Sequence, residues 1–172
     1  MPIWPFSPSK SDVDAARLLT EVVAASRHPA LFGDNGAPDT LEGRFELVTL
    51  HAALALVRLR EAPEAAALAQ SFTDKFFRQL DSGLREAGVG DTSVPKRMRK
   101  MAGAFYGRLS AYSAALAAGD LPALAAAVGR NVLGDEAALA ASRIAEHVED
   151  IARRQRLLPF QALLESAAWT RA

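Results

Sequence analysis

The sequence predicts an all-α protein, a single-domain helical bundle of about six to eight helices. Apolar residues recur every three to four positions along the whole chain, and no stretch alternates convincingly at the period of two that a half-buried strand requires. Segments that contain proline and glycine, such as residues 28–38, separate the periodic stretches. The 172 residues suit one domain, and 50% of them are hydrophobic, so the chain can build a core without crosslinks.

The chain divides into a short tail and one domain. Residues 1–10 are expected to form a flexible N-terminal tail, because the three prolines among them disfavour a helix. Residues 11–172 are expected to form the helical domain. The apolar side chains of the tail belong to Ile3, Trp4 and Phe6. Either they lie on the chain's own domain, or they enter a bilayer interface, where tryptophan is favoured.

The second predicted helix is the expected centre of the bundle. The first runs from about residue 11 to residue 27 and directs an apolar stripe toward the core, formed by Val13, Ala16, Leu19 and Val23. The second runs from residue 39 to about residue 61 and is apolar around most of its circumference, which is typical of a buried helix. Asp39 and Glu42 have the spacing of a capping box at its start. We therefore expect this helix to be the central strut.

Two further long helices are predicted. One opens at Pro63 and carries a buried stripe formed by Phe72, Phe76, Phe77, Leu80 and Leu84. It stops at Gly88, and Gly90 with Asp91 completes a turn. The other covers residues 93–118, with Ser93 or Thr92 as its cap, and carries an apolar stripe formed by Met98, Met101, Phe105, Leu109, Tyr112 and Leu116.

Gly103 and Gly107 lie inside this last helix, where each costs about 1 kcal/mol relative to alanine. A close crossing with another helix of the domain is the expected compensation. The alternative is a shallow cleft lined by backbone.

The last third of the chain predicts three more helices. They cover residues 120–134, 135–156 and 159–169, and the last ends at Trp169. The middle one is expected to bury Ala137, Ala140, Ile144, Val148 and Ile151.

Missing residues exclude several kinds of chemistry. The chain has no cysteine, which excludes disulfides, zinc–thiolate sites and thiol catalysis. The only histidines are His28, His51 and His147, and no two of them have the spacing of metal ligands on one helix face. There is no nucleophile elbow, no Walker loop and no dinucleotide-binding glycine motif. We therefore expect neither an enzyme nor a cofactor or metal.

Charge balances over the chain but not along it. Twenty basic residues equal twenty acidic ones, so no overall field draws the protein to DNA. Residues 34–91 hold ten acids and six bases, whereas residues 92–119 hold five bases and no acid. Four of these five bases are Lys96, Arg97, Arg99 and Lys100. They form a solvated helix face, or they bind RNA phosphates or anionic lipid.

Arg44, His51 and Arg58 recur every seven residues along the apolar strut, so they share one line on that helix. One interpretation is that the arginines reach the surface or pair with acids while His51 is a hydrogen-bonded core histidine. The other is a polar line along a groove that receives a partner helix.

Three blocks of the sequence resemble the ubiquinol–cytochrome c chaperone family in order and spacing. They are DTLEGRFELVTLHAALALVRLR (Asp39–Arg60), the run from FFRQLDSGLREAGVGD into VPKRMRKMAGAFYGRLSAY (Phe76–Tyr112), and LLPFQALLESAAWTRA (Leu157–Ala172). Trp169 in the third block matches a family tryptophan. Residues 114–134 depart most from the family pattern. Where members often carry an aromatic residue after the histidine, this chain has Ala52 and Ala53.

The resemblance implies a helical chaperone that catalyses no reaction and binds cytochrome b during assembly of respiratory complex III. Family members in mitochondria work with a small partner near the ribosomal exit. Because the chain shows no obvious transit peptide, it is similar to a bacterial member, cytoplasmic and peripherally associated with the inner membrane. Peripheral contact with the membrane or the ribosome follows from the same resemblance. Two alternatives stay open: a helical module that binds haem or another small molecule through His51, and an RNA-binding protein that uses the basic helix.

We expect the client to bind in a groove between the strut and the basic helix, because an apolar helix laid in a groove covers its surface and can later be released. The residues expected to bind the client are Arg44, His51, Arg58, Lys96, Lys100, Phe105, Tyr106 and Arg108. Lys96 and Lys100 would steer its charged loops or the membrane surface. Turn or structural roles are expected for Asp39, Gly88, Gly90, Asp91, Gly103, Gly107 and Trp169.

Overall fold

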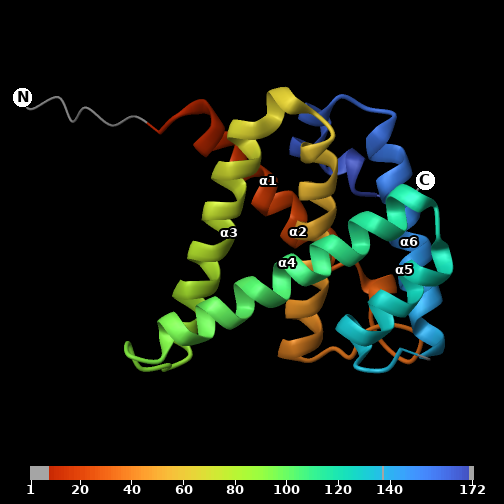
Figure 1. The fold of residues 1–172 in the computed structure, drawn as a ribbon, viewed down its shortest axis with the longest axis horizontal. Coiled ribbons are helices and arrows are strands. Elements are labelled where there is room, and N and C mark those ends of the chain that lie inside the picture. Colours follow the sequence, from red (N-terminus) through yellow and green to blue (C-terminus); the bar gives the residue numbers. More distant parts are fainter. Residues whose placement is uncertain (1–7, 137, 171–172) are drawn as a thin grey trace, which may run out of the picture.

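The structure, a computed structural model, describes residues 8–136 and 138–170. These residues form six α-helices and no strand, which confirms the predicted all-α bundle (Figure 1). The helices are α1 (Lys10–Ser26), α2 (Leu41–Arg60), α3 (Ala66–Glu86), α4 (Val94–Ala118), α5 (Leu121–Val128) and α6 (Leu139–Arg156). None of them, within the described ranges, is long and apolar enough to cross a bilayer.

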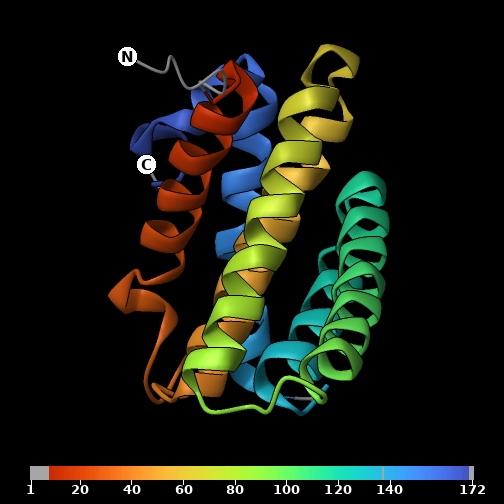
Figure 2. The ribbon, with the colours of Figure 1, turned by 90° about the vertical axis from the view of Figure 1, so that its left-hand side faces the viewer.

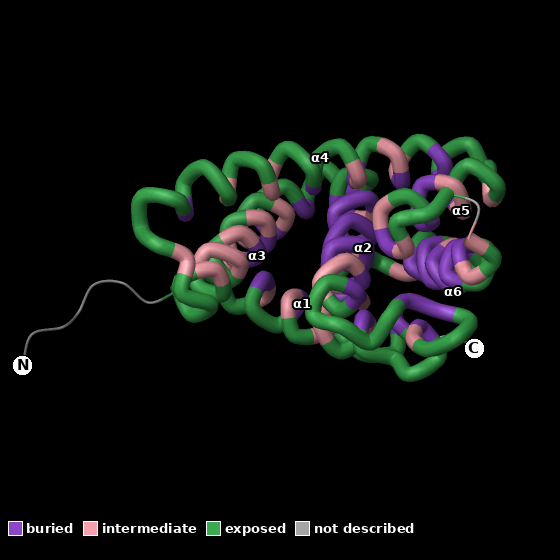
Figure 3. Tube along the Cα trace, turned by 90° about the horizontal axis from the view of Figure 1, so that it is seen from below, coloured by how far each residue is buried: buried purple, intermediate pink, exposed green. Residues whose placement is uncertain are grey.

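The core is built around α2, as the sequence predicts for the strut. Twelve of its 20 residues are buried, and α1, α3, α4 and α6 all contact it. Figure 3 shows this helix as an almost continuously buried rod between more exposed neighbours. The exposed residues lie near its two ends, and they include Leu41, an apolar residue that is 80% exposed. A helix that is apolar nearly all round is stable only when other helices enclose it.

The other long helices surround this rod in layers. In Figure 2, α1 and α4 lie on opposite sides of α3. The 25-residue α4 crosses in front of α2 and also contacts α3 and α5 (Figure 1). Because α3 and α4 follow one another in the chain, they form a helical hairpin whose turn lies at one end of the molecule.

The start of α2 differs from the expected capping box. Thr40 is the N-cap, and its hydroxyl accepts a hydrogen bond from the Gly43 amide at 3.1 Å. Asp39 lies one residue outside the helix and instead pairs with Arg44 at 2.6 Å. Threonine is also a favoured N-cap residue, and here its hydroxyl satisfies the amide of Gly43, one of the N-terminal amides that have no partner within the helix.

Helix α1 begins slightly earlier than the sequence predicts. Ser9 caps α1 by accepting a hydrogen bond from the Asp12 amide at 3.1 Å, and Lys10 is already helical. Residues 1–7, which include Ile3, Trp4 and Phe6, lie outside the described residues.

The predicted inward face of α1 is wrong by one residue. The buried residues are Ala15, Leu18, Val22 and Ser26, whereas Val13 is 56% exposed and Leu19 and Val23 are only half-buried. The helix packs against both α2 and α3, so the face between these two contacts becomes the core. Ser26 is accepted there because its hydroxyl donates to the Val23 carbonyl at 2.8 Å.

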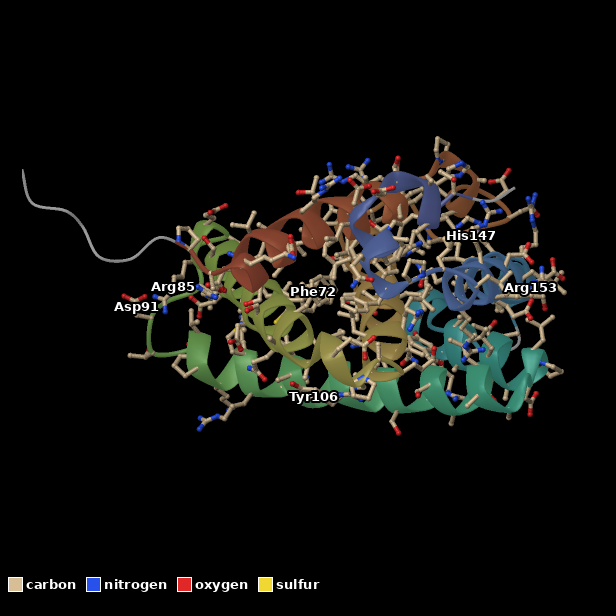
Figure 4. The ribbon with its side chains drawn as sticks, turned by 90° about the horizontal axis from the view of Figure 1, so that it is seen from above. Phe72, Arg85, Asp91, Tyr106, His147 and Arg153 are labelled. Carbon is tan, nitrogen blue, oxygen red and sulfur yellow. The ribbon has the colours of Figure 1, made fainter. Side chains whose placement is uncertain are left out.

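The turn between α3 and α4 follows the sequence prediction. Gly88 has a left-handed φ of 80°, and the carbonyl of Gly90 accepts from the amide of Ser93 at 2.8 Å, just before α4 begins. Arg85 binds Asp81 at 2.8 Å and also binds Asp91, so one guanidinium fastens the end of α3 to the turn (Figure 4). Ser93 occupies the cap position of α4 but makes no side-chain capping bond.

The C-terminal third is more broken than predicted. The helix expected over residues 120–134 consists of α5 and a π-helical turn, Gly129–Leu133. Helix α6 begins at Leu139 and buries Ile144, Val148 and Ile151 as expected, while Ala140 is half-buried and Ala137 lies outside the described residues.

Two 3₁₀ turns, Phe160–Leu164 and Ser166–Ala168, replace the last predicted helix. Extended backbone at Glu165 separates them. Trp169 closes the segment from a buried position, where its indole N–H donates to the Leu163 carbonyl at 2.9 Å.

The expected close crossing at Gly103 and Gly107 is also wrong. Both glycines are exposed, and a methyl group added to either would meet no atom within 4 Å. Gly43 in α2 is the opposite case, because a Cβ there would lie 2.0 Å from the Pro38 carbonyl oxygen. Of these three glycines, Gly43 alone is required by close packing.

We predict that Gly103→Ala and Gly107→Ala each raise the free energy of unfolding by about 1 kcal/mol, because alanine restricts the unfolded chain and favours the helix. Urea unfolding followed by circular dichroism measures the change. Gly43→Ala is the matched control and should lower stability. A loss of stability at Gly103 or Gly107 would show that this face of α4 is packed.

Candidate functional site

A groove of about 420 Å³ lies where α2, α3 and α4 meet, and we call it the central groove. It is lined by Phe45, Glu46 and Thr49 of α2, by Phe76, Leu80 and Leu84 of α3, and by Arg97, Lys100, Met101, Ala104, Phe105 and Arg108 of α4. Its volume and its mainly apolar walls with a few polar groups are typical of binding sites.

Aromatic rings set the spacing of the two helices that flank the central groove. The rings of Phe76 and Phe105 are 5.1 Å apart between centroids, and Phe77 meets Phe105 edge-on at 5.5 Å. Such tilted and edge-to-face pairs stabilise a contact beyond the area they bury. Phe76 and Phe105 are both buried and line the groove, so this cluster ties α4 to α3.

An ion pair crosses the groove between α2 and α4. Arg108 donates to Glu46 at 2.8 Å, and each side chain is only 18% exposed. Burial raises the pKa of the Glu46 carboxyl above its usual range, although the positive charge of Arg108 acts in the opposite direction. The two charges therefore depend on one another, because either one alone would be poorly solvated.

Three polar atoms near this pair have no hydrogen-bond partner in the described part of the chain. They are the second carboxylate oxygen of Glu46, the Nε of Arg108 and the hydroxyl of Thr49. Thr49 as a whole is only 2% exposed. Buried polar atoms without partners are uncommon in folded proteins, and each calls for an explanation.

The basic cluster is divided around α4. Arg97 and Lys100 line the central groove, whereas Lys96 and Arg99 do not. At 100° per residue, Lys96 lies on the solvent face with Gly103 and Gly107, and Arg99 lies between that face and Tyr106. Neighbouring residues of this basic run therefore lie on different faces of α4.

The expected line of Arg44, His51 and Arg58 does not border the groove. Arg44 pairs with Asp39 and is 59% exposed. His51 is completely buried, and its Nδ1 is 2.8 Å from the Leu47 carbonyl. Arg58 donates to the carbonyls of Gln155 and Leu158 at 2.9 and 2.7 Å, so it binds the end of α6. Their surroundings differ because helices pack on several sides of α2.

The structure brings together three of the residues expected to bind a client: Lys100, Phe105 and Arg108. Tyr106 is 46% exposed and lies against Phe77, beside a separate depression near the end of α2 (Figure 4). Sequence reasoning missed Glu46 and Thr49. Both are polar residues within the otherwise apolar strut, and this feature of the sequence could have identified them as candidates.

His51 lies close to His147 and Trp169, which are also buried, and His147 in turn lies close to the exposed His28. The ring centroid of His51 is 6.3 Å from that of His147 and 6.4 Å from Trp169, and His147 is 6.0 Å from His28. Burial lowers the pKa of His51 to about 4, so the ring is neutral at pH 7. Within the described residues no group of three or more His, Asp or Glu is placed to hold a metal ion.

Comparisons with known proteins identify relatives of this chain. Residues 34–165 match the family described as ubiquinol-cytochrome C chaperone. Among solved structures, the crystal structure of the Cbp3 homolog from Brucella abortus is 40% identical, with a TM-score of 0.80, and the match covers 91% of this chain and 87% of that chain. No curated protein sequence matches.

We predict that His51 makes the protein less stable in acid. Between the ordinary pKa of 6.5 and the folded value of about 4, unfolding takes up a proton, so stability falls as the pH falls through this window. The full loss is about 3 kcal/mol. Urea unfolding at pH 7 and at pH 4.5 should show a smaller difference for His51→Gln than for the wild type. Equal differences would contradict the assignment.

Proposed function

This chain belongs to the ubiquinol–cytochrome c chaperone family, and from that premise we propose that it binds cytochrome b as a client and promotes assembly of complex III. The observation that carries the proposal is the central groove, an apolar trough with cations on its rim. A protein that accompanies a membrane protein must cover apolar helix surface in water and release it later. A groove that receives an apolar or amphipathic helix meets both requirements.

The groove supplies different interactions along its length. The walls formed by Phe45, Leu80 and Met101 would cover the apolar face of a client helix. Phe105 lines the groove, and its ring contact with Phe76 holds α4 against α3. Lys100 would meet charges at the edge of the client. Arg108 is already bound to Glu46, so its part in client binding acts through that pair.

We propose that the basic residues of α4 that lie outside the groove contact the membrane. Lys96 and Arg99 are exposed and lie outside the groove. Basic residues close to an anionic membrane contribute about 1 kcal/mol each to binding. We place these two side chains toward the inner membrane, with peripheral contact, so that the groove lies close to where cytochrome b enters the bilayer. Binding and release, without a chemical reaction, then account for the activity.

A bulky side chain in the groove tests whether the client binds there. Ala104 is exposed and lines the groove, so Ala104→Trp should block the trough at little cost to stability. In a strain that lacks the chromosomal gene, this variant should restore little cytochrome b and little ubiquinol–cytochrome c reductase activity. Cytochrome b should also fail to co-purify with it.

Ser110→Trp is the matched control, because Ser110 is exposed on the same helix but lies outside the groove. It should restore assembly and capture cytochrome b as the wild type does. Normal capture by Ala104→Trp would show that the client binds elsewhere. Normal complex III in the deletion strain would contradict the assembly role itself.

A further inference from the structure

Arg97 and Lys100, on the rim of the central groove, have no ion-pair partner in the part of the chain that the structure describes. They are three residues apart on α4, so their side chains are neighbours. Neighbouring like charges repel one another, and the fold gains no stability from holding them together. Lys96 and Arg99 also lack an ion pair in the described residues, but only Arg97 and Lys100 border the apolar groove.

Three acids of α2, α3 and the hairpin turn form ion pairs with other arginines. Glu46 binds Arg108 inside the groove, and Asp81 and Asp91 both bind Arg85 at the hairpin turn. No acid occurs anywhere in residues 92–119. The protein thus offers two free cations beside an apolar trough and provides no anion of its own to neutralise them.

The accessible surface of the groove indicates what kind of molecule lies there. The second carboxylate oxygen of Glu46, the Nε of Arg108 and the hydroxyl of Thr49 are buried from solvent, so a molecule in the groove would not reach them. The accessible features are the apolar side chains of the lining and the two exposed cations, Arg97 and Lys100. A polypeptide can supply apolar side chains and a carboxylate together, so it matches both features.

We propose that the occupant of the central groove is an apolar polypeptide segment that carries an acidic side chain, whose carboxylate lies between Arg97 and Lys100. The inference rests on the proposed function and specifies the chemistry of the segment that is recognised. Charge-assisted hydrogen bonds from two neighbouring cations fix the position of the carboxylate. The segment is therefore held in one register, which apolar contacts alone would not select.

The test uses three fluorescein-labelled amphipathic peptides of about 20 residues, long enough to form a helix. They are identical except for one position beside the apolar face, which carries Glu, Gln or Lys. The full chain should bind the Glu peptide about fivefold more tightly than the Gln peptide, and the Lys peptide most weakly. Fluorescence anisotropy at low and high salt measures the affinities.

Reversal of the rim charges should reverse the preference. Arg97→Glu with Lys100→Glu should bind the Lys peptide more tightly than the Glu peptide. Lys96→Glu with Arg99→Glu makes the same change in net charge on the same helix turns but outside the groove, so it should keep the preference for Glu. Arg97→Gln with Lys100→Gln, a milder pair of changes, should bind the Glu and Gln peptides equally.

Equal binding of the three peptides by the wild type would overturn the proposal, and so would loss of the preference in both charge-reversed proteins. Vesicles of phosphatidylserine and phosphatidylcholine provide the other arm. If the rim variant loses vesicle binding while peptide binding is unchanged, the ligand is a lipid and the proposal is wrong. Cytochrome b capture is measured in parallel. If the wild type captures cytochrome b but binds the three peptides equally, the proposed function is supported and only this inference is wrong.

Discussion

Phe76 and Phe77 of α3 hold Phe105 of α4 at centroid distances of 5.1 and 5.5 Å, and the candidate site depends on this contact. It ties α4 to the bundle at mid-length, while Arg85 fastens the hairpin turn at the end. Between these two attachments the helices flank a trough whose base is formed by α2. Because α2 is buried along most of its length, that base is fixed. The groove is thus a consequence of two local attachments on one central rod.

The charged residues of the chain divide by whether the fold uses them. Arg58 binds the Gln155 carbonyl in the last turn of α6 and the Leu158 carbonyl just beyond it, which is a common role for a cation at a helix C-terminus. Arg85 and Arg108 are held by acids, the first at the surface and the second half-buried. Arg97 and Lys100 have neither kind of partner and lie at the groove. Their position beside the apolar groove is stronger support for binding than the number of basic residues is, since most surface charges contribute little to stability.

The spacing of apolar residues predicted the helices. It also identified α2 as the strut, because a helix that is buried on all sides is apolar around most of its circumference. The predicted inward face of α1 was wrong by one residue. This helix packs against both α2 and α3, and the sequence does not show how the two contacts divide its surface. Gly103 and Gly107 suggested a crossing, yet they lie on the exposed face of α4. The groove between the strut and the basic helix was predicted, and three expected residues line it. Glu46 could not be assigned, because its partner Arg108 is 62 positions away in sequence and only the fold joins them.

The central claim is that a client polypeptide occupies the trough between α2, α3 and α4. Site-specific photo-crosslinking tests it directly, with the photoreactive residue benzoylphenylalanine at Met101, a wall of the groove, or at Ser110, on the same helix but outside it. During synthesis of cytochrome b in cells, Met101 should give a crosslinked product with cytochrome b, and Ser110 should give none. A product from Ser110 alone would contradict the account, because the client would then lie on the opposite side of α4.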